Sequence, residues 1–141
     1  MYRWLDHTAE LELELEGTSE REVLVDALCA LRELLEGDKA AVSPRGTGAQ
    51  ADRLERREIH AAAGDRPALL AAWLEELLFL SESEGFMPLA VGELSLQDES
   101  LSAIVLGRPG KPRALVKAAT YHRLQFETSD RGYRGHVVFD V

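Results

Sequence analysis

Several residue types that mark particular protein classes are scarce in this chain of 141 residues. A single cysteine cannot form a disulfide within the chain, so we expect a protein of a reducing compartment that folds without cross-links. No hydrophobic run approaches the roughly 18 residues that a membrane-spanning helix needs. Asp6 and His7 stand where a signal peptide would have its apolar region. These absences predict a cytoplasmic protein.

Positive charge and aromatic residues are also in short supply. The chain has 16 Lys and Arg against 25 Asp and Glu, a net charge of -9, and its aromatic residues make up 6% of the total. Because proteins grip nucleic acids through basic side chains and aromatic stacking, we expect no tight direct nucleic-acid binding. An acidic surface suits metal cations or a basic protein partner. One basic stretch fits either a solvated surface or a docking surface: Arg108, Lys111, Arg113, Lys117 and Arg123.

The hydrophobic pattern of the first half predicts a strand and two helices within one domain. Residues 10–16 alternate Glu and Leu, which is typical of a strand with one buried face. A capping box that begins at Ser19 predicts the start of a first helix. Gly37 predicts the end of that helix. A second helix follows Asp65 and ends at Gly85. Its apolar residues nearly encircle its later half, so we expect it to be deeply packed.

The remaining segments read as a loop and five strands. Residues 38–52 have proline, glycine and little periodicity, and predict an irregular loop. Strands are expected near 53–62, over 87–96 with an irregularity near Gly92, over 101–106, over 113–127, and up to Val141, with turns at 107–110 and 129–132. His122 falls on the apolar-leaning face of the strand over 113–127, which favours an interior histidine. The whole, residues 1–141, is predicted to be one α/β domain of the α+β two-layer kind, a mixed sheet with two helices on one face.

Acidic groups stand at the start of the first long strand and at the end of the last one. They are Glu10, Asp140 and Val141, whose terminal carboxylate adds a third negative group. If the two strand ends are neighbours, the charges repel one another, and a hard divalent cation would offset the repulsion. Exposed strand ends that share no site fit the same residues, and spacing alone does not decide between the two.

Histidines offer a different chemistry. His7 beside Asp6, or His122, could act as a general base in a small acid–base enzyme if these groups converge in a pocket. A hydrogen-bonded structural histidine is the alternative in both places. The sequence has no paired-cysteine or paired-histidine metal motif, no phosphate-binding glycine loop and no serine nucleophile elbow.

Four segments, in order along the chain, resemble motifs of the archease family. Residues 6–10 read Asp-His-Thr-Ala-Glu, similar to the Asp-His-Thr-Ala-Asp opening of that family. The others are a Leu-Leu-x-x-Trp-Leu-x-Glu-Leu-Leu helix at 69–78, Val-Lys-Ala-Ala-Thr-Tyr-His at 116–122, and a Val-x-Phe-Asp-Val ending within 132–141. Together the four span nearly the whole chain.

The resemblance implies a similar fold and a role as a non-catalytic activator of an RtcB-type RNA ligase in tRNA splicing or RNA repair. The ligase would carry out the covalent chemistry with GTP and a divalent metal, and the activator would promote its guanylylation and multiple turnover. The resemblance also implies a metal site on Glu10, Asp140 and Val141, with Glu10 where the family usually has aspartate. Oxygen ligands favour Ca²⁺, with Mg²⁺ or Mn²⁺ as alternatives. A stand-alone divalent-metal-binding chaperone or scaffold, and a small His/Asp acid–base enzyme, remain the alternative functions.

Overall fold

The computed structural model describes residues 1–6, 10–36, 54–112 and 116–141. The elements in chain order are β1 (Tyr2–Asp6), β2 (Glu10–Gly17), α1 (Glu20–Glu36), β3 (Glu55–Ala62), α3 (Arg66–Ser83), β4 (Phe86–Leu96), β5 (Ser100–Pro109), β6 (Ala118–Ser129) and β7 (Gly132–Asp140). The loop predicted at 38–52 lies outside the described residues.

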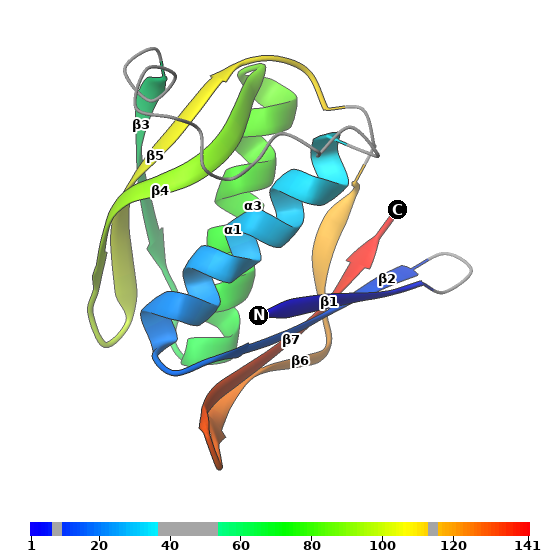
Figure 1. The fold of residues 1–141 in the computed structure, drawn as a ribbon, viewed down its shortest axis with the longest axis vertical. Coiled ribbons are helices and arrows are strands. Elements are labelled where there is room, and N and C mark those ends of the chain that lie inside the picture. Colours follow the sequence, from blue (N-terminus) through cyan, green and yellow to red (C-terminus); the bar gives the residue numbers. More distant parts are fainter. Residues whose placement is uncertain (7–9, 37–53, 113–115) are drawn as a thin grey trace.

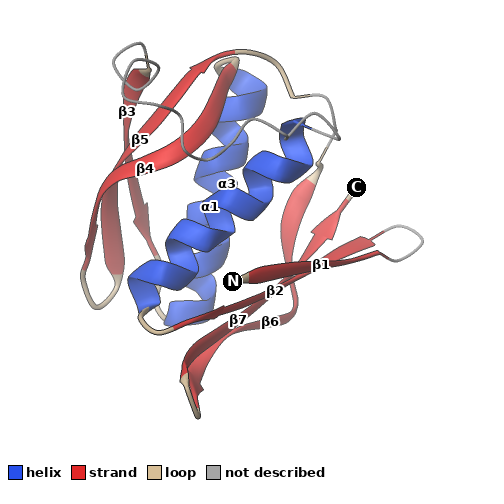
Figure 2. Ribbon diagram, in the orientation of Figure 1, coloured by secondary structure: helices blue, strands red, loops and turns tan. Residues whose placement is uncertain are grey.

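The strands form two sheets that enclose the helices. One sheet has the order β1-β2-β7-β6 and the other the order β3-β5-β4, and all their pairings are antiparallel. Helices α1 and α3 lie between the sheets (Figures 1 and 2), and each helix contacts strands of both. The α+β class and the two helices are confirmed. The single mixed sheet is replaced by two antiparallel ones, because alternation reveals a strand but not its partners.

The predicted helix boundaries are confirmed with one change in detail. The Ser19 hydroxyl accepts the Glu22 N–H at 3.1 Å, as in a capping box. The Glu22 carboxylate, however, accepts the backbone N–H and the hydroxyl of Thr18 rather than reaching Ser19. Asp65 caps α3 by accepting the N–H of Ala68 at 2.8 Å, and Gly85, with φ +62°, ends the helix as predicted.

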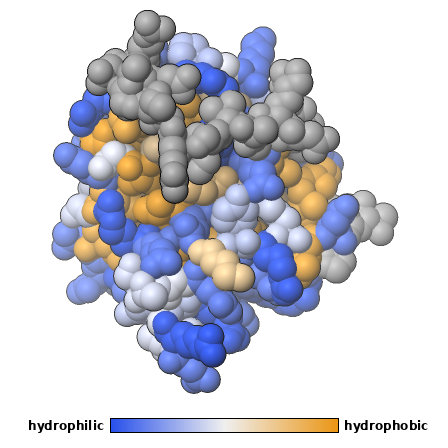
Figure 3. Space-filling view, viewed as in Figure 1, coloured by the Kyte–Doolittle hydropathy of each residue, from blue (hydrophilic) through white to orange (hydrophobic). Residues whose placement is uncertain are grey.

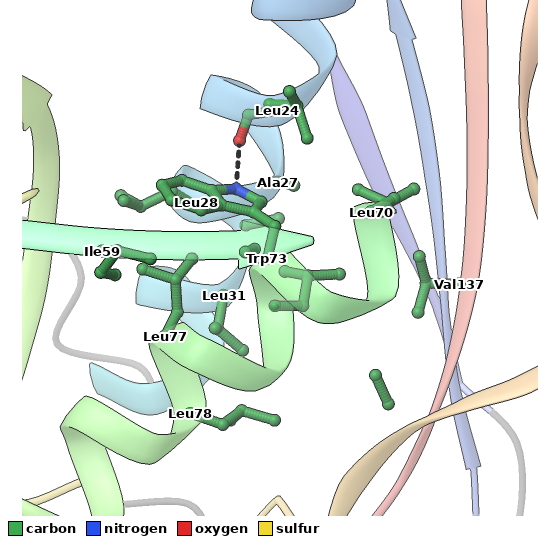
Figure 4. Close-up of a cluster of buried hydrophobic side chains, with 14 of the residues drawn as sticks. Leu24, Ala27, Leu28, Leu31, Ile59, Leu70, Trp73, Leu77, Leu78 and Val137 are labelled. Atoms are coloured by element: carbon green, nitrogen blue, oxygen red, sulfur yellow. Dashed lines mark hydrogen bonds between the residues drawn. The ribbon is translucent and has the colours of Figure 1, made fainter. Parts of the chain in front are cut away.

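The two helices carry the central core. Trp73 of α3 is fully buried against α1, and its indole N–H donates to the Leu24 carbonyl at 2.9 Å (Figure 4). The deep packing expected for this helix is confirmed. Its buried apolar residues include Leu69, Leu70, Trp73, Leu74, Leu77 and Leu78. Neither helix among the described residues is both long and apolar enough to cross a membrane.

The strand predicted to end before a turn at 107–110 continues to Pro109. Gly107 pairs with Pro88, and a Cβ on Gly107 would collide with the Met87 carbonyl and lie 2.6 Å from Cζ of Phe86. Glycine is needed here for close approach of two strands rather than for a turn. The irregularity predicted near Gly92 is confirmed as a register shift between Val91 and Glu93.

The face predicted for the strand over 113–127 is wrong in its middle. Thr120 pairs with Val138 and Gln125 pairs with His136, so four residues of β6 stand opposite one residue of β7. This insertion reverses the alternation, as bulges do. His122 is therefore exposed rather than interior.

Candidate functional site

The structure brings together the two strand ends that the sequence singled out. Glu10 is the first residue of β2 and pairs directly with Asp140, the last residue of β7. Residues that face one another across an antiparallel pair project from the same side of the sheet. Figure 1 shows the C-terminus beside the start of β2. We call Glu10, Asp140 and Val141 the acidic corner.

The acidic corner is accessible yet fixed in position. Glu10 is half-buried, Asp140 is exposed and Val141 is 39% exposed. Asp140 also pairs with Ala118 on its other side, and the Lys117 N–H donates to the Asp140 carbonyl at 2.9 Å. The backbone of Asp140 is thus held between two strands while its carboxylate faces solvent.

The donor set of the acidic corner suits a hard cation. Two carboxylates from adjacent strands and the main-chain oxygens of Val141 are all oxygen donors, which Ca²⁺ and Mg²⁺ prefer. Within the described residues, no three Asp, Glu, His or Cys side chains are grouped to hold a metal. A cation held here would therefore complete its shell with main-chain oxygens, water or groups of a partner.

The other residues predicted to carry chemistry do not join this corner. Asp6 ends β1 and pairs with Leu11, so it projects from the face of the sheet opposite to Glu10. His122 is exposed on the β6 bulge. His7 lies outside the described residues. The arrangement of Asp6 and His122 offers no support for an acid–base pair.

Sequence reasoning missed a polar cluster on the solvent side of the same sheet. Glu12 was expected among solvated glutamates, yet it is only 5% exposed. It forms an ion pair with Arg123, and one of its oxygens lies 3.4 Å from Nε2 of His136. His136 Nδ1 lies 2.8 Å from the Arg123 carbonyl. The three residues are spread over 124 positions, so no local signal could have found them.

Ion pairs engage part of the basic stretch. Arg108 lies 3.5 Å from Glu36, and Arg123 is paired with Glu12. Arg113 lies outside the described residues. Two of the five cations are therefore partly neutralised by carboxylates, which weakens the docking reading of this stretch.

A serine, a histidine and a glutamate meet on the other sheet. His60 Nδ1 lies 3.2 Å from the Ser102 hydroxyl, and His60 Nε2 lies 2.8 Å from Glu58. The His60 and Glu58 side chains are about two-thirds exposed, at 66% and 65%. Because water competes for hydrogen bonds at such exposure, we interpret the trio as a surface network.

Burial raises the pKa of the Cys29 thiol, which argues against a nucleophile there.

Comparison with known sequences matches almost the whole chain. Residues 2–141 match the family model described as the Archease protein family. The protein archease of Archaeoglobus fulgidus is 30% identical, covering 99% of this chain and 98% of its own length. The protein archease of Methanopyrus kandleri is 31% identical, covering 97% of this chain and 96% of its own length.

Solved structures give the same picture for the fold. Protein 1598 of Methanobacterium thermoautotrophicum superposes with a TM-score of 0.67 at 26% identity, covering 99% of this chain and 98% of its own. An archease of Thermotoga maritima, described as a possible chaperone, superposes with a TM-score of 0.60 and covers 100% of this chain and 98% of its own. At 21% identity the second likeness concerns the fold alone.

Proposed function

The chain belongs to the archease family, as its motifs predicted, and we propose that it is a non-catalytic protein cofactor of an RtcB-type RNA ligase. In this proposal it promotes guanylylation and multiple turnover of the ligase during tRNA splicing or RNA repair in the cytoplasm. The acidic corner is the working part, and it binds a divalent cation through Glu10, Asp140 and Val141.

One observation carries the proposal: the direct pairing of Glu10 with Asp140 at a solvent-facing strand end. The C-terminus and the start of β2 lie at one edge of the molecule (Figure 1), where the pair can reach another protein. The side chains of the corner are two carboxylates and a valine, a set that suits cation binding.

Electrostatics explain why such a corner would act on a ligase that uses a nucleotide and a divalent metal. Two adjacent carboxylates repel each other, and a cation relieves that repulsion. A bound cation would supply positive charge next to the partner's phosphates or nucleophile. The chain's own part is to hold the two carboxylates in register and to place them, through the rigid β2–β7 pair, against the partner.

The test is a multiple-turnover ligation assay with the cognate RtcB-type ligase. Wild type is compared with Asp140→Asn and Glu10→Gln, which keep side-chain size but remove one negative charge each. We expect both variants to lose stimulation, with turnover falling to that of the ligase alone. Glu16→Gln is the matched control, since Glu16 lies on the same face of β2 at its other end.

Two outcomes contradict the proposal. Stimulation by Asp140→Asn at the wild-type level would remove the acidic corner from the mechanism. Cation binding by the wild type without any effect on the ligase would favour the alternative, a divalent-metal-binding chaperone or scaffold with no ligase partner.

A further inference from the structure

The insertion in β6 is a defined element of the fold rather than a local irregularity. Residues 121–124 stand opposite a single residue of β7. Arg123 within it has φ +52°, in the left-handed region that non-glycine residues rarely occupy. Figure 1 shows β6 changing direction at mid-length. We call residues 121–124 the β6 bulge.

The β6 bulge folds over the solvent side of the sheet. Arg123 leaves the edge strand β6 and reaches Glu12 on β2, which lies beyond β7. Glu12 and its partner Val138 are 5% and 0% exposed, whereas Asp140, two residues along the same face, is open to solvent. Solvent is therefore excluded from this face only around Glu12 and Val138, where the bulge crosses the sheet.

The bulge is anchored by three polar contacts. The ion pair with Glu12 holds the side chain of Arg123, and His136 Nδ1 contacts the Arg123 carbonyl. At its start, the His122 N–H donates to the Thr120 hydroxyl at 3.4 Å. A residue in a strained conformation, held by an ion pair to a buried carboxylate, points to a function that requires the conformation.

The conformation presents two side chains to solvent. Tyr121 is 71% exposed, the most exposed aromatic residue among those described, and His122 beside it is also exposed. Both follow Thr120 closely, only a few residues from Ala118, which pairs with Asp140. An exposed aromatic residue thus stands three residues along β6 from Ala118, the pairing partner of Asp140.

We propose that the β6 bulge is a docking element that seats this chain, through Tyr121 and His122, on a positively charged protein surface beside the site that the acidic corner enters. This inference rests on the proposed function. Charge complementarity selects the partner, because the chain carries a net charge of -9 and the neighbouring corner is acidic. A tyrosine ring accepts Arg or Lys across its face and is a frequent anchor of protein interfaces.

The experiment measures binding of the ligase without and with RNA, alongside stimulation at increasing concentrations of this chain. We expect Tyr121→Ala to weaken binding about tenfold or more, as truncation of an anchor residue does. The concentration for half-maximal stimulation should rise by the same factor, while the maximum is unchanged. Tyr121→Phe, which keeps the ring, should stay close to wild type.

A second variant tests the anchoring. Arg123→Gly suits the backbone at φ +52° and removes the ion pair, so it should fold and still bind more weakly than wild type. Its melting temperature checks the fold. His60→Ala is the matched control for His122→Ala, because both histidines are exposed but His60 lies on the other sheet.

The outcomes separate this inference from the proposed function. If the wild type binds and stimulates the ligase while Tyr121→Ala does so with the same affinity, the docking role is wrong and the acidic corner stands. If Tyr121→Ala weakens binding only when RNA is present, the surface contacts RNA and the protein-docking proposal is overturned. If the wild type neither binds nor stimulates the ligase, both proposals fail together.

Discussion

Gly107 illustrates how much one residue decides in this fold. In the sequence it looks like part of a turn, but in the structure it lets β4 and β5 approach closely beside the ring of Phe86. A methyl group there would lie 2.6 Å from Cζ of Phe86 and would also collide with the Met87 carbonyl. We expect Gly107→Ala to lower the free energy of unfolding by about 1–3 kcal/mol, the usual cost of overpacking.

Urea unfolding followed by circular dichroism measures this change. Gly64→Ala is the matched control, since an added Cβ there meets nothing within 4 Å. It should be neutral or stabilising by up to about 1 kcal/mol, because alanine restricts the unfolded chain. Equal free energies for the two variants would show that Gly107 is not needed for close approach.

The burial of Glu12 shows a limit of prediction from the local sequence pattern. The alternating Glu and Leu of β2 correctly predicted a strand, and Leu13 and Leu15 are fully buried as expected, whereas Leu11 is half-buried. The same alternation placed every glutamate in solvent. Glu12 departs from it because Arg123 arrives from a strand that is distant in sequence, and no pattern around residue 12 records that contact.

Among the elements, β6 shows why alternation fails across an insertion. His122 was expected on the face of the even-numbered residues, and Val116 and Phe126 on that face are indeed buried. Ala119 is buried as well, so the buried positions change parity between 119 and 126. Helix ends were easier to predict, because caps such as Asp65 act within three or four residues.

The start of α1 gives a pH-dependent prediction. Hydrogen bonds from the Thr18 hydroxyl and N–H lower the pKa of Glu22. A lowered pKa in the folded state stabilises the protein above the unfolded value of about 4.3, and this contribution is lost as the pH falls through the folded pKa. Thr18→Val removes the hydroxyl bond, so we expect it to be less stable than wild type at pH 7 and equal to it well below the glutamate range.

Urea midpoints at the two pH values provide the measurement. Thr128→Val serves as the control, since Thr128 is an exposed threonine of β6. It should show no pH-dependent difference from wild type. A stability loss in Thr18→Val that is the same at both pH values would mean that the bond to the Glu22 carboxylate is not its cause.

At the scale of the whole molecule, the sequence predicted the helices and most strands better than how the strands assemble. The family motifs and the acidic strand ends were found in the sequence, and the pairing of Glu10 with Asp140 places those ends together. The division of the strands into two sheets depends on long-range pairing that composition does not encode. The short strand β1 was not predicted, although it pairs with its neighbour in sequence, β2. On the face shown in Figure 3, hydrophobic residues lie mainly on the left and through the middle of the view, and the lowest part is hydrophilic.

The proposed cation site makes a prediction about the stability of the whole molecule that does not involve the ligase. A cation that binds only the folded state stabilises it by about 2.7 kcal/mol at 100 times its Kd. For a domain of this size that corresponds to a rise in Tm of roughly 5–10 °C. We expect saturating Ca²⁺ to produce this rise in wild type, and a chelator to reverse it. Titration with Mg²⁺ and Mn²⁺ ranks the three ions.

The variants locate the effect. Asp140→Asn removes one of the two paired carboxylates and should abolish the rise, because the cation then loses one of its negatively charged ligands. Glu16→Gln removes the same charge from the other end of β2, so it should retain the rise if the effect is local binding rather than general screening of an acidic protein. A similar loss in both variants would point to net charge, and a full rise in Asp140→Asn would place the cation elsewhere on the molecule.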